Sequence, residues 1–199
     1  MPLGDSITQG VGSSTGADYR GPLQELLGDD VDFVGSQQAD PIRDPDHEGH
    51  SGYLIQQLRD GLDGWLAAAQ PTVVLLHAGI NDLDRGETTR APERLLDLVG
   101  QVHVGRPEVA VIVLGLIPTT AGLEGQAQQF NAAVRQGAGA HRFRWVEAPA
   151  LTAAEIADRL HPNNLGYERI AKAIVSALDQ SDESFLHGRS PGCRSVSGG

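Results

Sequence analysis

The stretch Gly4-Asp5-Ser6-Ile7-Thr8-Gln9-Gly10 follows a short apolar segment, Met1-Pro2-Leu3, which we expect to be the end of a β-strand. Two glycines bracket a turn with a serine inside it. A serine at this place lies at the carboxyl end of a strand, where open α/β sheets carry their reactive groups. A serine hydroxyl is a weak nucleophile at neutral pH unless a base takes its proton. The turn therefore predicts a nucleophile, provided that the chain also supplies a base.

A histidine with a neighbouring carboxylate occurs near the other end of the chain, in Asp158-Arg159-Leu160-His161-Pro162. An aspartate three residues before a histidine can fold back to hold the imidazole, which leaves the second ring nitrogen free for a hydroxyl. Ser6, Asp158 and His161 then form a candidate catalytic triad in the order Ser, Asp, His. Each motif alone is more often an ordinary turn or a helix-end salt bridge, so the prediction depends on their combination.

Two further segments carry donors for a developing negative charge. His50-Ser51-Gly52-Tyr53 precedes an amphipathic segment, and Gly79-Ile80-Asn81-Asp82 follows a continuous apolar run. The backbone N–H groups of Ser6 and Gly52 and the side-chain amide of Asn81 are the donor types that an oxyanion hole needs. Asp5 and Asp82 flank these positions. We interpret both as structural hydrogen-bonding residues, since one carboxylate already orients the base.

Apolar runs and amphipathic segments alternate along the chain. Besides the first strand, the runs predict strands at 31–34, 72–76, 109–117 and 143–146, and helical periodicity predicts helices at 19–27, 53–69, 87–104, 123–134 and 165–178. The alternation predicts an α/β fold: a three-layer α/β/α sandwich around a parallel sheet of about five strands. Because right-handed crossovers bring the carboxyl ends of the strands to one edge, the candidate residues are expected to meet there.

Length and charge limit the remaining possibilities. A chain of 199 residues is long enough for one domain with a sizeable core, which we expect over residues 1–180. The Ser-, Gly- and Arg-rich residues 181–199 predict a flexible C-terminal tail. The formal net charge of −11 argues against nucleic acid and anionic membranes as partners. No apolar stretch approaches the about 20 residues of a membrane span. No signal peptide precedes Met1, so the sequence as it stands predicts a cytoplasmic protein, or else a trimmed form of an exported one, and it leaves the compartment open.

The segment 37–52 is predicted to be a long polar loop at the mouth of the site. Crowded within it are Asp44, Asp46, His47, Glu48 and His50. The zinc-helix pattern His-Glu-x-x-His is broken by Ser51, and proline and glycine oppose a helix, so we predict no metal site. The glycines after Ser6 have the wrong spacing for a dinucleotide loop, so we predict no cofactor. His50 either contacts substrate or makes a structural hydrogen bond, and Trp65 is interpreted as a core residue rather than a sugar platform.

The blocks around Ser6, Gly52, Asn81 and Asp158/His161 appear in the order of the SGNH (GDSL-type) hydrolases, which about the first 170 residues resemble. A closer similarity is to the acetylxylan esterases of carbohydrate esterase family 3. The segments that carry it are Met1-Pro2-Leu3-Gly4-Asp5-Ser6-Ile7-Thr8, Asp32-Phe33-Val34-Gly35-Ser36, His47-Glu48-Gly49-His50-Ser51-Gly52 and Leu160-His161-Pro162-Asn163. Similar esterases are often secreted.

The resemblance implies the SGNH-hydrolase fold, with a flavodoxin-like central sheet, and ester hydrolysis through an acyl-enzyme on Ser6 without metal or cofactor. The subgroup implies removal of short acyl groups, in particular acetyl, from a carbohydrate or another polar alcohol. One alternative is a broad-specificity short-chain esterase or lysophospholipase. The absence of an apolar lid segment favours a small acyl group. A non-catalytic ligand-binding α/β module is the other alternative, and it predicts a missing member of the triad.

Overall fold

A computed structural model describes residues 1–29, 31–39 and 42–179 of the chain. It contains a six-stranded sheet in the order β2-β3-β1-β4-β5-β6. The strands are β1 (Pro2–Gly4), β2 (Gln37–Gln38), β3 (Asp46–Gly49), β4 (Val73–His77), β5 (Ala110–Leu114) and β6 (Phe143–Val146). All neighbouring strands are parallel except β2 and β3, which are antiparallel. Five strands therefore form the predicted parallel sheet, and β2 is added at its edge.

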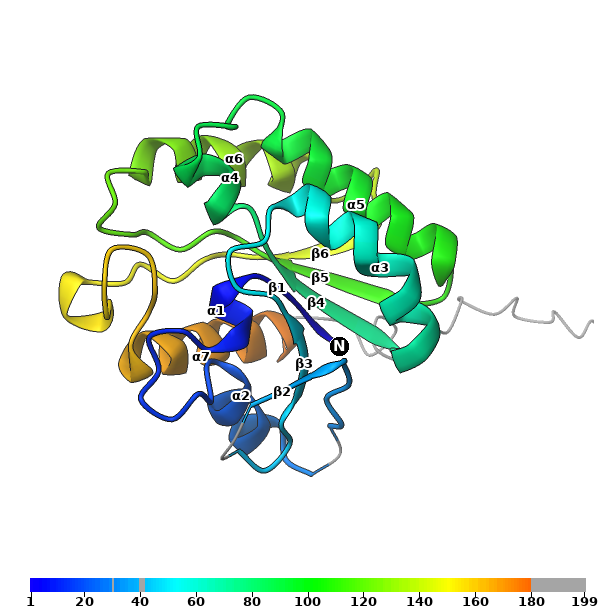
Figure 1. Cartoon of the computed structure of the whole chain (residues 1–199), viewed down its shortest axis with the longest axis horizontal. Helices are drawn as coiled ribbons and strands as arrows, with labels where there is room; N and C mark the ends of the chain where they lie inside the picture. Colours follow the sequence, from blue (N-terminus) through cyan, green and yellow to red (C-terminus); the bar gives the residue numbers. More distant parts are fainter. Residues whose placement is uncertain (30, 40–41, 180–199) are drawn as a thin grey trace, which may run out of the picture.

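Helices cover both faces of this sheet (Figure 1). They are α1 (Ser6–Gln9), α2 (Arg20–Leu27), α3 (Ile55–Ala69), α4 (Ile80–Asp84), α5 (Ala91–Gly105), α6 (Glu124–Gln136), the short 3-10 turn η1 (Ala153–Glu155) and α7 (Asn164–Asp179). Helices α3, α5 and α6 lie above the sheet in Figure 1, and α2 and α7 lie below it. The predicted three-layer α/β/α sandwich is confirmed. No helix in the described part of the chain is long and apolar enough to span a bilayer.

The central strands are apolar because both of their faces are covered. In β4 and β5 the side chains of Val74, Leu76, Val111 and Val113 are fully buried, as expected for parallel strands between two helical layers. The helices contribute one apolar stripe each, for example Leu58 and its neighbours in α3. Because these strands are parallel, their carboxyl ends lie together at the left of Figure 1, beside α1 and α4.

One predicted strand is wrong. Residues 31–34 have no regular structure, although Phe33 is buried, and the strand beside β1 is β3, taken from the segment predicted to be a polar loop. The hydrophobic pattern does not predict β3 because this strand contains no apolar side chain. His47 and Glu48 are buried. Glu48 accepts from Ser36 on another segment and His47 accepts from the N–H of Gly49 within the strand, so no apolar periodicity indicates a strand. The predicted tail, residues 181–199, lies outside the described residues.

At Gly49 the strand β3 lies against the backbone of α1. A Cβ atom at Gly49 would lie 2.5 Å from the backbone nitrogen of Gln9 and 2.7 Å from the carbonyl carbon of Thr8. We expect Gly49→Ala to lower the free energy of unfolding by about 1–3 kcal/mol, because backbone on the facing element cannot move aside cheaply. Urea denaturation measures the effect.

The matched control is Gly64→Ala, at an exposed position inside α3 where an added Cβ meets nothing within 4 Å. This substitution is expected to raise the free energy of unfolding by about 0.5–1 kcal/mol, since alanine is the better helix former. Equal urea midpoints for the two variants would contradict the close approach of β3 and α1.

Candidate active site

Ser6 stands at the junction of β1 and α1. Asp5 is the N-cap of α1, and its carboxylate accepts a hydrogen bond from the N–H of Ile7 at 3.0 Å. The helix lasts one turn and ends at Gly10, whose φ of +100° suits glycine. This short helix holds Ser6 at the carboxyl edge of the sheet with 4% of its surface exposed. Its backbone N–H lies in the first turn, where N–H groups have no intrahelical acceptor.

The structure brings Ser6, His161 and Asp158 together. The Nε2 atom of His161 lies 2.8 Å from the Oγ atom of Ser6, although 155 positions separate the two residues. The Nδ1 atom of His161 lies 2.8 Å from the Oδ2 atom of Asp158. With Nδ1 protonated and donating to the carboxylate, Nε2 is free to accept the Ser6 hydroxyl proton. The arrangement has the geometry of a nucleophile, a base and a carboxylate that orients the base.

Asp158 is fixed by more than the imidazole. Its Oδ1 atom accepts hydrogen bonds from the backbone N–H groups of Leu160 at 2.7 Å and His161 at 2.9 Å. The hydroxyl of Thr120 donates to its carbonyl oxygen. Burial by itself raises the pKa of the Asp158 carboxyl, but the hydrogen bonds from Leu160 and His161 outweigh it and lower the pKa below its ordinary value. The group is therefore ionised at neutral pH and can stabilise an imidazolium.

The turn 50–53 is tied to its surroundings at almost every backbone group. The N–H of His50 donates to Gly4, and the N–H of Tyr53 donates back to His50. Ser51 donates to the side-chain oxygen of Gln9 at 3.1 Å. Gly52 has a φ of +76°, and its N–H has no partner within the described residues. An unpaired N–H on a fixed turn beside Ser6 is a ready donor for an anion.

Asn81 lies at the start of α4, directly after β4. One N–H of its side-chain amide donates to the carbonyl oxygen of Tyr53 at 3.0 Å, and the second has no partner in the part of the chain that the structure describes. Asn81 is 9% exposed. The strand before it pairs with β1, Gly4 facing His77, so Asn81 and Ser6 follow adjacent strand ends. The three predicted oxyanion donors therefore gather at one edge, joined through the turn that carries Gly52.

Asp82 caps the helix that follows this turn. It is fully buried, and its carboxylate accepts from the N–H of Ile55 at 3.0 Å and from the guanidinium of Arg94 at 2.9 Å. The interpretation of Asp82 as a structural residue therefore agrees with its contacts.

Sequence reasoning missed two arginines around the site. Arg85 donates to the carbonyl oxygen of Gly52 at 3.0 Å. Arg159, next to Asp158, forms a two-pronged ion pair with Asp84 at 2.9 and 2.7 Å, across 75 positions of sequence. The first interaction joins the Gly52 turn to the end of α4. The second joins the loop that carries Asp158 and His161 to α4. The only signal in the sequence is adjacency to a motif residue, because nothing local indicates a partner so distant.

The acidic and histidine side chains of the predicted loop bind protein groups. Asp44 accepts from the N–H of Phe33, and Asp46 accepts from the Gln38 amide. The Nδ1 atom of His47 accepts from the N–H of Gly49 at 2.9 Å. In the residues that the structure describes, no group of three or more such side chains could hold a metal ion.

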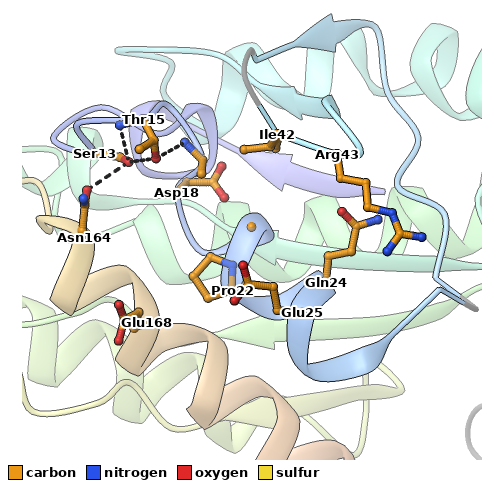
Figure 2. A pocket seen from close by; sticks show the side chains of 12 residues that line it. Ser13, Thr15, Asp18, Pro22, Gln24, Glu25, Ile42, Arg43, Asn164 and Glu168 are labelled. Carbon is orange, nitrogen blue, oxygen red and sulfur yellow. Dashed lines mark hydrogen bonds between the residues drawn. The ribbon is translucent and has the colours of Figure 1, made fainter.

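A cavity of about 460 Å³ lies between the loop 13–18, α2 and the start of α7 (Figure 2). Polar and apolar side chains both line its wall, and the Ser13 hydroxyl donates to Asn164 at the left of Figure 2. Neither Ser6 nor His161 is among the residues that line it. The cavity is therefore separate from the candidate active site.

Asp5 is fully buried, and its Oδ2 atom lacks a hydrogen-bond partner in the described structure. Burial raises its pKa to about 7, the charge of Asp82 adds to the effect, and the N–H of Ile7 opposes it. Between pH 4 and pH 7 the unfolded chain has lost this proton while the folded chain keeps it, so stability falls as the pH rises. Above the folded pKa both states are ionised and the dependence ends.

We therefore expect Asp5→Asn to become progressively more stable than the wild type between pH 4 and pH 7, by at most about 1.4 kcal/mol per pH unit. The difference should level off above pH 7. Thermal or urea unfolding of both proteins across this range measures it. A difference that does not change with pH would show that Asp5 is ionised in the folded protein throughout.

Known proteins resemble this chain over most of its length. The model of the GDSL-like Lipase/Acylhydrolase family matches residues 3–169. A family 3 carbohydrate esterase from Clostridium thermocellum has a similar structure, with a TM-score of 0.80 and 32% identity, over 90% of this chain and 94% of that one. An acetyl esterase mutant solved with an acetate ion has a TM-score of 0.75 and 25% identity, over 91% of this chain and 98% of that one.

A curated relative, the multidomain esterase of Ruminococcus flavefaciens, is 28% identical over 217 aligned positions. The alignment covers 90% of this chain but only 28% of that relative, so the chain spans little more than a quarter of its length. The match of the family model over residues 3–169 decides the class: this chain belongs to the GDSL-like lipase/acylhydrolase family. It is accordingly a carboxylic ester hydrolase by class, and the predicted resemblance is confirmed.

Proposed function

We propose that this chain removes short acyl groups, in particular acetyl, from a carbohydrate or another polar alcohol, through an acyl-enzyme on Ser6. The observation that carries the proposal is the 2.8 Å contact between Nε2 of His161 and Oγ of Ser6, with Asp158 bound to the opposite ring nitrogen. The complete triad argues against a non-catalytic binding module. The carbohydrate and acetyl esterases among the similar structures support the choice of substrate class.

In the first half of the reaction Ser6 Oγ attacks the ester carbonyl carbon while His161 Nε2 takes the hydroxyl proton. The carbonyl oxygen becomes an oxyanion, which the N–H groups of Ser6 and Gly52 and the free amide N–H of Asn81 stabilise. When this intermediate collapses, the bond to the alcohol breaks and His161 returns the proton to the leaving oxygen. Asp158 keeps the ring oriented and stabilises its positive charge.

In the second half a water molecule attacks the acyl-enzyme. His161 takes a proton from the water as the new C–O bond forms, and the same donors hold the second oxyanion. Collapse breaks the bond to Ser6 Oγ, His161 reprotonates the serine, and the carboxylic acid leaves. The cycle needs no group beyond these side chains, the backbone donors and water.

The test compares hydrolysis of 4-nitrophenyl acetate, butyrate and octanoate with release of acetate from acetylated xylan. A strong preference for acetate, with release from xylan, is the expected result. Preference for the longer chains together with inert xylan would favour the broad esterase or lysophospholipase. The absence of Ser6-dependent turnover on every ester would favour the binding module.

A further inference from the structure

The imidazole of His50 occupies an unusual place beneath the Gly52 turn. Its ring stacks on Tyr53 at a centroid distance of 4.8 Å and on Trp65 of α3 at 4.5 Å, with interplanar angles of 18° and 17°. The ring edge faces the carboxylate of Glu48, with Nε2 2.7 Å from Oε1. Only 14% of the His50 side chain is exposed. The ring is thus held by two aromatic faces and one carboxylate.

Glu48 is fully buried in β3, where an isolated carboxylate would be costly. Its other partners are the N–H of Ser36 at 2.8 Å and the Ser36 hydroxyl at 2.7 Å. Burial alone raises the pKa of the Glu48 carboxyl, but the hydrogen bonds from His50 and Ser36 bring it below its ordinary value. The buried anion therefore fixes the direction of the His50 ring edge, which a purely apolar contact would leave free to rotate.

This ring connects the sheet to the turn that carries the free N–H. Glu48 belongs to β3, Trp65 belongs to α3, and Tyr53 closes the turn through its own N–H bond to His50. Displacement of the ring would let Tyr53 and the 51–52 peptide shift together. A misplacement of about 1 Å in a catalytic group can cost about a hundredfold in rate.

We propose that His50, paired with Glu48 and stacked between Tyr53 and Trp65, is a positioning residue that aims the Gly52 N–H at the oxyanion. The inference rests on the proposed ester hydrolysis. His50 does not touch the reacting atoms in this assignment, so it acts on transition-state stabilisation and not on substrate affinity. The sequence leaves two roles open for His50, a contact with substrate or a structural hydrogen bond. The proposal favours the structural hydrogen bond, and it adds that this bond affects catalysis.

Steady-state hydrolysis of 4-nitrophenyl acetate tests the inference. We expect His50→Ala to lower kcat about 100-fold, comparable to the loss of one oxyanion donor, and to leave KM within about threefold. Trp65→Leu should lower kcat in the same manner, and Trp65→Phe, which keeps a stacking ring, should recover most of the loss. The control is His141→Ala, near the amino end of β6 and far from this edge, which should leave both constants unchanged.

A double-mutant cycle separates positioning from general loosening of the fold. If His50 acts through the oxyanion hole, the effects of His50→Ala and Asn81→Ala on kcat should not multiply, because both impair the same stabilisation. Multiplicative effects, or a kcat within about threefold of the wild type in folded His50→Ala and Trp65→Leu proteins, would overturn the inference. Circular dichroism and the unfolding midpoint establish that the variants are folded.

Fluorescence provides a readout that does not depend on activity. The chain has two tryptophans, so Trp145→Phe leaves Trp65 as the only indole, which can be excited selectively over the tyrosines. A protonated imidazole stacked on an indole quenches its emission, and His50→Ala in this background should therefore raise the emission at a pH low enough to protonate the ring. Unchanged emission would show that the stack is not formed and would overturn the inference. A wild type without Ser6-dependent turnover but with normal quenching would instead overturn the proposed function, so the two failures are distinguishable.

Discussion

Replacement of Ser6 by alanine is expected to lower kcat for 4-nitrophenyl acetate by at least about 10⁴-fold. The covalent route disappears with the hydroxyl, and only substrate binding and the oxyanion donors remain to assist water. The fold should not change, because the Ser6 side chain donates to or accepts from no group but His161 in the described structure. Release of 4-nitrophenol, followed at 400 nm or by chromatography, measures the loss.

The control for this substitution is Ser176→Ala, at an exposed serine of α7. It should have wild-type kcat and KM. Incubation of the wild type with a fluorophosphonate and mass spectrometry of the product should give one adduct, on Ser6. Activity of Ser6→Ala within about tenfold of the wild type, or an adduct on another serine, would show that Ser6 is not the nucleophile.

The Asp158→Asn variant is expected to lose about 10³- to 10⁴-fold in kcat with little change in stability. The asparagine oxygen can still accept from the backbone N–H groups of Leu160 and His161, so the loop keeps its shape. Its amide nitrogen, however, faces Nδ1 of His161 and donates to it. The ring then carries its proton on Nε2 and cannot take the proton of Ser6.

Asp97→Asn is the matched control, since it alters an exposed carboxylate that also faces a cation, Arg59, at 3.4 Å. Exposed pairs of this kind contribute little, so kcat and the unfolding midpoint should be unchanged. Steady-state kinetics of both variants on 4-nitrophenyl acetate measure the two changes in kcat. A decrease of less than about tenfold in Asp158→Asn would mean that another group orients His161.

The order of the elements could be predicted from the sequence, and so could the meeting of Ser6, Asp158 and His161 at one edge of the sheet. The pattern of continuous apolar runs and amphipathic segments reports burial directly, and it located β4, β5, β6 and the long helices within a few residues. Asp158 and His161 are three positions apart, so their contact is local. Ser6 follows a strand end, and parallel strands share one edge, which is enough to expect Ser6 and His161 to meet.

The sequence alone could not determine β3 or the surroundings of the Gly52 turn. In β3 a buried strand contains His47 and Glu48. The burial of Glu48 is offset by hydrogen bonds from Ser36 on another segment, and that of His47 by the N–H of Gly49 in the same strand. The more exposed pair of Arg159 with Asp84 likewise joins two segments that are far apart in the sequence. Such polar contacts form only where the fold brings donor and acceptor to a suitable distance and direction. They therefore produce no periodic pattern in the sequence.

The sequence by itself therefore determined the fold class, the parallel sheet and the proximity of the three candidate triad residues, because hydrophobic periodicity and short-range spacing are properties of the chain. The tertiary structure alone decided which strand lies beside β1, how Arg85 and Asn81 hold the turn, and where His50 stands between Trp65 and Glu48. Those outcomes depend on contacts of polar and aromatic side chains with other segments, which become defined only when the packed layers bring those segments together.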